Sequence, residues 1–442
     1  MMKIVRITSW LLLACCLVGC NQSKDTLAIF VAGDTQGWIT PCGCAANQSG
    51  GLARRATLVA SASSTADTLL LDVGGSAHGT SAYQQLKFES LLQGLHQMGL
   101  EAMNVGGPET EFTPDQLAKI EESTQIKWLS SNLQTSDGKP FGLSSLSVSR
   151  AGMTIEITGV VDPSLVKHEQ WNAIEPVQGV LKAFAGSQAD VHVVLAYLEE
   201  DALRKLAESL PEVDYIIGGP TGQAISPTKV GPVTIMSSTN KGKFLASLKL
   251  KSEGDRFQQL AAEIAEVKSG LSEDPTQLDN LKAYYAKLAK EDFTVQEAGL
   301  VADMGDVKKG YSIAGSASCV QCHQQDDSVW HQSKHSHAWD VLVAKSAHFD
   351  PHCQQCHTTG YGLAGGFTNV AQSTTLVHVG CENCHGPSEA HVANPRTRTP
   401  FQAKEQCIRC HDHENSPAFQ FDAYWAKVYH AGLKSAEPIS GE

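Results

Sequence analysis

The sequence predicts an α/β layered sandwich over residues 20–252, followed by a mainly α-helical domain over residues 316–442. Two observations predict this division of a chain of 442 residues. Between residues 27 and 250, short apolar runs that often end in glycine alternate with segments of helical periodicity. Beyond residue 315, the pattern C-x-x-C-H occurs four times and long apolar runs are scarce.

The strands of the α/β part are predicted from five apolar runs, and the helices from the segments between them. Strands alternating with helices predict a layered sheet with functional residues at the strand ends. The predicted strands are LAIFVAG (27–33), TLLLDVG (68–74), EAMNVGG (101–107), VHVVLAY (191–197) and VDYIIGG (213–219). The predicted helices are GLARRATLVASAS (51–63), YQQLKFESLLQGLHQMG (83–99) and DALRKLAESL (201–210).

Two further segments with helical periodicity predict a helical linker over residues 253–315. They are DRFQQLAAEIAEVKSGL (255–271) and PTQLDNLKAYYAKLAKEDF (275–293), separated near Pro275. We expect the linker to hold the C-terminal domain on the α/β part.

The N-terminus predicts export. Lys3 and Arg6 precede the apolar run ITSWLLLACCLV, which is too short to span a membrane comfortably. The run ends in LVGC (17–20), which resembles the lipobox of bacterial lipoproteins. We therefore expect residues 1–19 to be a signal peptide and Cys20 to carry acyl chains that anchor the protein, facing the periplasm. The alternative is an ordinary cleaved signal in which Cys20 is an incidental apolar residue.

The net charge limits the kinds of partner that are expected. A formal net charge of −13 argues against nucleic acid, whose phosphates demand a basic surface. Redox partner proteins and the membrane, reached through the lipid, are the expected partners.

The four C-x-x-C-H motifs predict four covalently bound c-type haems. In this signature two thiols form thioether bonds to the porphyrin and the adjacent histidine ligates iron. Zinc knuckles are the alternative, but zinc does not require a histidine directly after the second cysteine. The attachment cysteines are Cys319, Cys322, Cys353, Cys356, Cys381, Cys384, Cys407 and Cys410, and the proximal histidines are His323, His357, His385 and His411.

The composition of the C-terminal domain predicts bis-histidine ligation. Thirteen of the 17 histidines lie beyond residue 315, where methionine is absent. Nine histidines therefore remain for the second face of an iron, and His/His ligation gives lower potentials than Met/His ligation. Four haems within 93 residues leave little polypeptide for an apolar core, so we expect the porphyrins to be the core.

Residues 316–432 resemble the tetrahaem cytochrome c-554 family, whose founding function is electron carriage in ammonia oxidisers. The resemblance rests on CVQCHQQDDSVWHQSKHSHAW, CQQCHTTGYGLAGGFT, VGCENCHGPSEAH and FQFDAYWAKVYH. It implies three bis-histidine haems and a second haem with one open face.

Carried over by position, the resemblance implies distal ligands. His391 would cap the first haem, His335 the third and His430 the fourth, with His337 a competitor of His335. His378, three residues before Cys381, either closes the second haem or lies beside it. Four others are expected to be solvated or to contact propionates: His331, His348, His352 and His413.

The α/β part resembles the metallophosphoesterase domain of bacterial 5′-nucleotidases, from which most metal ligands are missing. Of the residues that would hold two metals, only Asp34 remains. Gly75 stands for the bridging aspartate and Tyr197 for the strand-end histidine, while the other motifs read Gly106-Gly107-Pro108-Glu109 and Gly219-Pro220-Thr221-Gly222. Without the metals no hydroxide is generated for phosphoryl hydrolysis, so we expect an inactive, pseudo-metallophosphoesterase domain. His78, His96, His168 and His192 do not rebuild the site and are expected to be ordinary core or surface residues.

Cys42 and Cys44 follow the first predicted strand, where the metals would have been. Three interpretations remain open for them: a strained redox disulfide, a soft-metal site, or a structural bridge.

These patterns predict a membrane-anchored tetrahaem cytochrome that transfers electrons, with the nucleotidase-like domain docking a partner or positioning the haem domain. The alternative is an oxidoreductase acting on a small nitrogen or sulfur species at a five-coordinate second haem. Metal-dependent nucleotide hydrolysis is a third hypothesis, opposed by the missing ligands.

Overall fold

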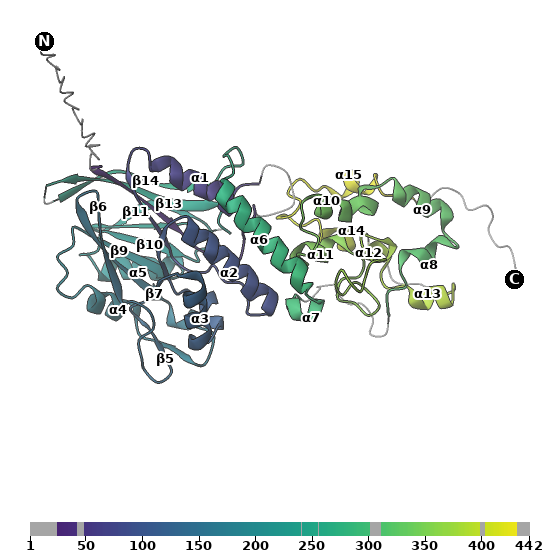
Figure 1. Ribbon diagram of the computed structural model, residues 1–442, viewed down its shortest axis with the longest axis horizontal. Helices are drawn as coiled ribbons and strands as arrows, with labels where there is room; N and C mark the ends of the chain where they lie inside the picture. Colours follow the sequence, from purple (N-terminus) through teal and green to yellow (C-terminus); the bar gives the residue numbers. More distant parts are fainter. Residues whose placement is uncertain are drawn as a thin grey trace, which may run out of the picture.

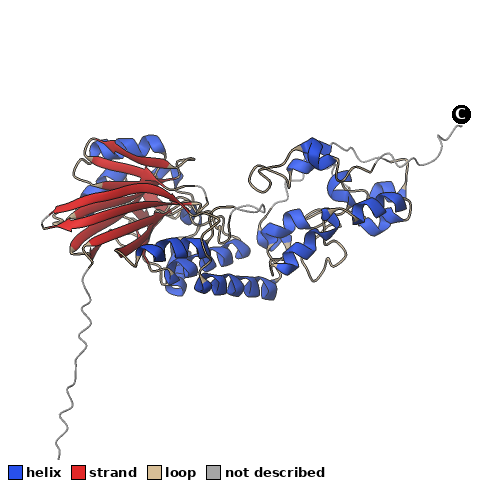
Figure 2. Ribbon diagram, turned by 90° about the horizontal axis from the view of Figure 1, so that it is seen from above, coloured by secondary structure: helices blue, strands red, loops and turns tan. Residues whose placement is uncertain are grey.

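The computed structural model describes residues 24–41, 48–239, 241–254, 256–300, 311–397 and 403–430. Cys20, Cys42, Cys44 and the predicted signal peptide lie outside these ranges. The chain forms an elongated molecule, with a β-rich N-terminal domain beside a helical C-terminal domain (Figures 1 and 2).

The N-terminal domain is built on two six-stranded sheets, which confirms the predicted α/β layered fold. All five predicted strands are present. The first sheet has the order β14–β13–β1–β2–β3–β4: Arg256–Glu266, Phe244–Glu253, Thr26–Ala32, Asp67–Asp72, Leu100–Asn104 and Trp128–Leu129. The second has the order β11–β12–β10–β9–β7–β6: Ile225–Val230, Val233–Ser237, Tyr215–Gly219, Val191–Tyr197, Met153–Val161 and Ser145–Arg150. A small sheet pairs β5 (Leu133–Thr135) with β8 (Trp171–Ala173).

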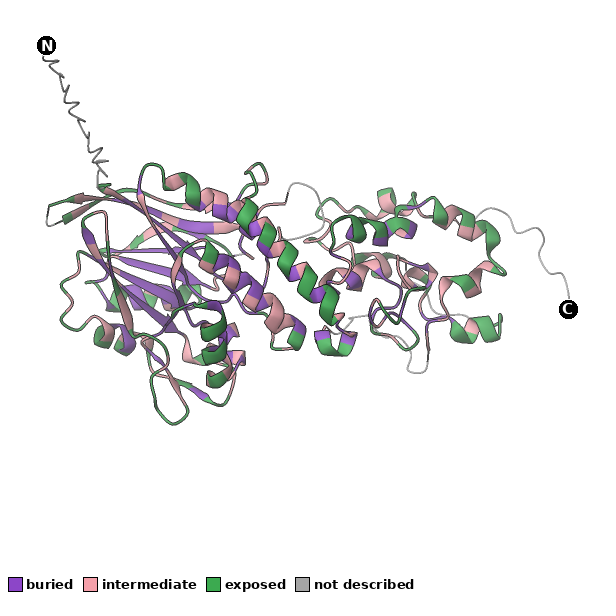
Figure 3. Ribbon diagram, in the orientation of Figure 1, coloured by how far each residue is buried: buried purple, intermediate pink, exposed green. Residues whose placement is uncertain are grey.

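Alternation along the central strand β1 explains the layering. Leu27, Ile29 and Val31 join the main core, which also contains residues of the second sheet. Their neighbours Ala28 and Phe30 join a smaller cluster that includes residues of helix α1. Because successive side chains of a strand point to opposite faces, both faces of this strand are covered (Figure 3).

Helices cover the outer faces of the sheets. Ser81 and Thr113 begin two of them with capping boxes. In each box the hydroxyl accepts a hydrogen bond from the backbone N–H of a glutamine three residues later, and the side chain of that glutamine accepts one from the backbone N–H of the first residue. The helices of this domain are α1 (Leu52–Ala62), α2 (Ala82–Gln97), α3 (Pro114–Thr124), α4 (Pro176–Ala183) and α5 (Glu200–Ser209), with short 3₁₀ turns η1 (Pro108–Glu111) and η2 (Pro163–Leu165).

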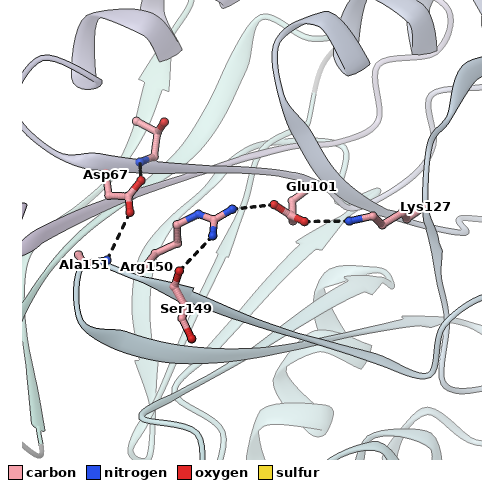
Figure 4. A network of polar contacts seen from close by, with 7 residues as sticks. Asp67, Glu101, Lys127, Ser149, Arg150 and Ala151 are labelled. Atoms are coloured by element: carbon pink, nitrogen blue, oxygen red, sulfur yellow. Dashed lines mark hydrogen bonds and ion pairs between the residues drawn. The ribbon is translucent and has the colours of Figure 1, made fainter. Parts of the chain in front are cut away.

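A polar network joins the two sheets near the N-terminal ends of strands β2 and β3 (Figure 4). Glu101 accepts from both Arg150 and Lys127, each at 2.9 Å. Asp67, the first residue of β2, accepts from the amide of Ala151 at 3.3 Å. Arg150 ends β6, whereas Asp67 begins β2 and Glu101 is the second residue of β3, so the contacts of Arg150 and Ala151 cross between the sheets.

The first predicted linker helix is wrong. Residues 256–266 form strand β14, which pairs antiparallel with β13 from Phe244 opposite Glu266 to Glu253 opposite Arg256. The pairing supplies backbone hydrogen bonds that override the helical propensity of its alanine and glutamate residues. The N-terminal sheet therefore continues beyond residue 252.

The second predicted helix is present as α6 (Pro275–Glu291), followed by the single turn α7 (Val295–Ala298). Helix α6 lies against α2, where Gln277 donates to the carbonyl of Gly94 and Asn280 to that of Ser90, both at 3.0 Å. A Cβ at Gly94 would lie 2.6 Å from the Gln277 carbonyl oxygen, so glycine permits this close packing. Helix α6 is thus part of the N-terminal layer and extends toward the C-terminal domain (Figure 1).

The C-terminal domain is made of short helices, none longer than eight residues within the described ranges. Its described hydrophobic cluster is small and centres on Trp339, Tyr361 and Phe367. Most of the surrounding helices are half-buried or exposed (Figure 3). The elements are α8 (Ser316–Val320), α9 (Gln324–His331), η3 (Lys334–His337), α10 (Ala338–Ala344), α11 (Pro351–His357), α12 (Cys381–His385), α13 (Glu389–Ala393), α14 (Ala403–Ile408) and α15 (Phe421–Trp425).

Across the described ranges, every helix is too short or too polar to cross a bilayer.

Candidate functional site

The C-x-x-C-H motifs lie on short helical turns. Helices α11 and α12 contain the whole second and third motifs. Because residues three apart lie on one face of a helix, this spacing presents both thiols of a motif to the same side.

Contacts between cysteines order the four motifs in space. Cys319 of the first motif is hydrogen-bonded to Cys381 of the third. Cys356 of the second motif is hydrogen-bonded to Cys410 of the fourth. Burial, and then the nearby Cys407 of the fourth motif, raise the pKa of Cys384 in the third to about 11. The motifs therefore follow one another in the order first, third, fourth, second.

Three of the four motif histidines face a second imidazole. The ring centroids are 6.3 Å apart for His323 and His391, 6.2 Å for His411 and His335, and 5.9 Å for His385 and His430. Two metal–imidazole bonds of about 2 Å each separate ring centroids by roughly 6 Å. The spacing of all three pairs fits a metal held between them.

Two of the predicted pairings are exchanged in the structure. His391 faces the first motif, as expected. However, His335 faces His411 of the fourth motif rather than the third, and His430 faces His385 of the third rather than the fourth. Position along the chain does not determine this pairing, because the third and fourth motifs are neighbours in space.

Hydrogen bonds at Nδ1 orient several of these imidazoles. Nδ1 of His391 lies 2.8 Å from the carbonyl of Thr397, and Nδ1 of His430 lies 2.8 Å from that of Val428. Nδ1 of His323 lies 3.1 Å from the Asp326 carboxylate. A histidine that donates from Nδ1 keeps the lone pair of Nε2 for a metal, and such outer partners are typical of ligating histidines.

Burial favours the neutral, ligating form of four histidines. It is the largest cause that lowers the pKa of each. The four are His335, His357, His385 and His411.

The histidine of the second motif has a different neighbour. Nδ1 of His357 lies 2.7 Å from the carbonyl oxygen of Ala338, so its Nε2 is available to iron. The amide N–H of Trp339 donates to Nδ1 of His378 at 3.3 Å, near the start of α10. An acceptor Nδ1 places the proton of a neutral imidazole on Nε2, so His378 is in the tautomer that does not ligate through Nε2. His378 also has a φ of 74°, a conformation that favours glycine.

The remaining histidines of the domain divide into exposed and half-buried. His331, His337 and His413 are exposed, and His337 lies 3.1 Å from Asp340 rather than facing a motif histidine. His348 packs against Phe349, with ring centroids 4.5 Å apart. His352 was expected to be solvated or to contact a propionate, but its ring packs edge-on against Trp38 of the N-terminal domain at 5.1 Å.

In the N-terminal domain, Asp34 is buried and engaged by protein donors. Its carboxylate accepts from Gln36 at 3.0 Å and from the hydroxyl of Thr239 at 2.6 Å. These bonds occupy both oxygens of the carboxylate that the sequence predicts to be the last remaining metal ligand.

Glu109 and Tyr197 fill the space around Asp34. The Glu109 carboxylate accepts backbone N–H bonds from Gly75, Ser76, Ala77 and Gly106 at 2.7–3.0 Å. The Tyr197 ring is so close that a Cβ at Gly75 would lie 2.5 Å from it. The Tyr197 ring therefore leaves room only for glycine at position 75.

A fully buried pair, Asp72 and Arg55, lies behind this site. Burial raises the pKa of Asp72 to about 7, although the amide of Gly74 donates to it at 2.8 Å. Burial also lowers the pKa of Arg55, and its Nε and Nη1 have no hydrogen-bond partner among the described residues. Among the residues that the structure describes, no three His, Cys, Asp or Glu side chains are placed to hold a metal ion.

The two domains meet through contacts that sequence reasoning missed. Tyr83 and Tyr284 both donate to the buried carboxylate of Asp350, at 2.7 and 3.1 Å. Lys241 forms an ion pair with Glu414 at 2.5 Å. No sequence signal identifies these partners, because up to 267 residues separate them along the chain.

Comparison with known sequences finds a likeness to c-type cytochromes in the C-terminal part. Residues 318–386 match the family described as cytochrome c554 and c-prime. Cytochrome c-554 of Nitrosomonas europaea is 28% identical over 162 residues, which cover 27% of this chain and 69% of that protein. The C-terminal part therefore resembles the cytochrome c-554 family, as the motifs predict, and covalently bound c-type haem follows from that resemblance.

Comparison with solved structures gives the fold of the N-terminal part. A 5′-nucleotidase precursor from Thermus thermophilus superposes with a TM-score of 0.52 at 20% identity, over 61% of this chain and 60% of that one. A sulfate thiohydrolase from the same species gives a TM-score of 0.53 at 16% identity, over 62% of each chain. A Haemophilus influenzae NAD nucleotidase gives 0.52 at 12% identity, over 66% and 64%. This chain thus spans about 60% of the length of these enzymes and shares the fold of their nucleotidase-type domain.

Proposed function

We propose that this protein is a c-type cytochrome that carries four haems and transfers electrons at a membrane surface, with a nucleotidase-like domain that has lost hydrolytic activity. The observation that carries the proposal is the set of three facing imidazole pairs beside motifs whose thiols are in contact. Bound c-type haem supplies reversible one-electron chemistry. The protein supplies the attachment cysteines, the axial histidines and the spatial arrangement of the motifs.

The order of the motifs supports a relay with two ends. The first motif lies at one end, where Cys322 and His323 are exposed. The second lies at the other end, where His352 packs against Trp38 of the N-terminal domain. An exposed first end suits a redox partner protein, and the covered end is held by the N-terminal domain.

Inactivity of the nucleotidase-like domain is supported by packing. Four backbone N–H groups hold the Glu109 carboxylate, and Tyr197 fills the space next to Gly75. A divalent metal would need oxygen or nitrogen ligands in place of these contacts. The domain instead positions the C-terminal domain through Asp350 and the pair of Lys241 with Glu414.

An oxidoreductase acting on a small nitrogen or sulfur species is the second candidate. The hydrogen bond from Trp339 to Nδ1 of His378 favours it, because this bond leaves the second motif without a described imidazole opposite His357. The two candidates differ in whether a substrate reaches that iron.

Export and anchoring belong to the proposal as well. They are supported by Lys3, Arg6 and the LVGC sequence that ends at Cys20. Redox exchange at Cys42 and Cys44 also stays a prediction, to be tested by labelling free thiols before and after mild reduction.

The proposal is tested by haem stoichiometry. The exported, membrane-extracted protein is expected to contain four haems per chain by pyridine haemochrome assay. Replacing one cysteine pair with alanine, for example Cys381 and Cys384, should remove one haem. Zinc without haem in the wild-type protein would overturn the proposal, and turnover of a small nitrogen or sulfur compound at the second haem would favour the second candidate.

A further inference from the structure

We propose that the cavity between the two domains is a binding site for a small oxyanion. The cavity has a volume of about 130 Å³ and is lined by Trp38, His78, Lys87, Lys241, His352 and Glu414, among others. A single water molecule needs only about 10–15 Å³ of such volume, so the cavity has room for a polyatomic ion.

The charges around the cavity favour an anion. Lys87 forms no ion pair with any described residue, and its ammonium lies above the rings of Trp38 and Tyr83, 5.6 and 5.8 Å from their centroids. Lys241 and Glu414 neutralise each other at 2.5 Å. One lysine charge therefore remains uncompensated on the wall of a partly enclosed site, where it interacts more strongly with an anion than in open water.

His352 adds a neutral donor to the wall. Its ring is half-buried and makes no hydrogen bond to a described residue, while one edge packs against Trp38. Burial and then the charge of Lys87 lower the pKa of His352 to about 4, so its ring is neutral at pH 7. A neutral imidazole offers one N–H donor, and this donor is free to bond a ligand in the cavity because no described residue accepts from it.

Other candidate ligands fit the cavity less well. The uncompensated charge of Lys87 repels a cation, and two of the polar wall groups are already engaged. The Tyr83 hydroxyl donates to Asp350 at 2.7 Å, and the Gln84 carbonyl accepts from the amide of Ser81 at 3.3 Å. The lining is too polar for an apolar ligand, since ammonium and imidazole N–H groups would lose water without a partner.

Both domains contribute to the site. Trp38, His78 and Lys87 belong to the N-terminal domain, whereas His352 and Glu414 belong to the C-terminal domain. An anion bound here would bridge the two domains beside Cys353 of the second motif, because His352 directly precedes that cysteine. Binding would therefore stabilise the docked arrangement.

The test is calorimetric titration of the full-length holoprotein with sulfate and nitrate as redox-inert probes, in a chloride-free buffer at pH 7. We expect one site per chain for at least one probe. Lys87→Met should weaken binding by about tenfold or more, because a charge-assisted hydrogen bond is lost. Lys87→Arg keeps the charge and should retain most of the affinity.

Lys119→Met is the matched control, since Lys119 is exposed on α3. It should leave the affinity unchanged. The melting temperature of the wild-type protein should also rise with probe concentration, and the rise should be lost in Lys87→Met. Absence of binding to the wild-type protein, or equal binding to the Lys87→Met variant, overturns the proposal. Haem content, checked in the same samples, keeps this outcome separate from failure of the electron-transfer function.

Discussion

His357 and His378 hold the same peptide group from opposite sides. The carbonyl oxygen of that group, on Ala338, accepts from Nδ1 of His357, and its amide, on Trp339, donates to Nδ1 of His378. One imidazole therefore keeps a free Nε2 and the other carries its proton there. In the proposed function, this difference separates His357, the proximal ligand that the sequence predicts, from His378, which stabilises the backbone of α10.

The first prediction concerns this pair. Carbon monoxide should bind one haem per chain in the dithionite-reduced wild-type protein, and the His378→Ala variant should show the same stoichiometry. The reason is that Nε2 of His378 carries a proton and does not close the second iron. Soret difference spectra measure the result. A wild-type protein that binds no carbon monoxide, together with a variant that binds one equivalent, would show that His378 is the ligand.

Removing His430 should open a second iron. His430→Ala is expected to add one carbon monoxide equivalent, because its ring faces His385 at 5.9 Å. His413→Ala is the control, since His413 is exposed. In a protein that lacks Cys381 and Cys384, the substitution at His430 should add nothing; an added equivalent there would mean that His430 belongs to the fourth motif.

Gly75→Asp should destabilise the N-terminal domain rather than restore a metal site. A Cβ would lie 2.5 Å from the Tyr197 ring, and the glycine has a φ of +77°. We expect a loss of about 2 kcal/mol or more in the free energy of unfolding, measured with urea. Gly231 has a similar backbone conformation and open space around it, so Gly231→Asp should lower the free energy of unfolding by less. Adding Tyr197→Ala should recover part of the loss. If the effects of the two substitutions on the free energy of unfolding simply add, the packing explanation is wrong.

The buried carboxyl of Asp72 should make stability fall as pH rises from about 4 to 7. Its pKa is raised from 3.8 to about 7, so in this window the native state keeps a proton that the unfolded state has released. Unfolding then releases a proton and is favoured by higher pH, with a slope of at most about 1.4 kcal/mol per pH unit. Urea unfolding at pH 5 and pH 7 should show a weaker decline for Asp72→Asn than for the wild-type protein. Identical declines would place the pKa of Asp72 near its ordinary value in the native state.

Asp350→Asn should weaken the domain interface. The carboxylate accepts from Tyr83 and Tyr284, and asparagine offers only one acceptor oxygen. We expect a loss of roughly 1–3 kcal/mol in the free energy of unfolding, whereas Asp340→Asn on the exposed side of α10 should have little effect. In the Asp350→Asn background, Tyr83→Phe should cost less than in the wild-type protein. Equal costs would mean that the two groups do not interact.

The chemistry of attachment and the α/β fold could be predicted from local patterns. Cys381 and Cys384 lie within one helical turn of His385, so the geometry that c-type haem requires is contained in five residues. The apolar runs at β1 and β9 identify buried strands because each run pairs on both sides within a sheet. The expected loss of metal ligands at Gly75 and Tyr197 also comes from the residues themselves, and it stays a prediction.

Only the tertiary structure decided which distant residues meet. Residues 256–266 have a helical pattern, yet pairing with β13 makes them a strand. His335 and His430 exchange the motifs expected for them, and His352 contacts Trp38 rather than solvent. The physical reason is common to these cases. Local spacing determines how a segment can bind, but the partner of a long-range contact is selected by the packing of the whole chain.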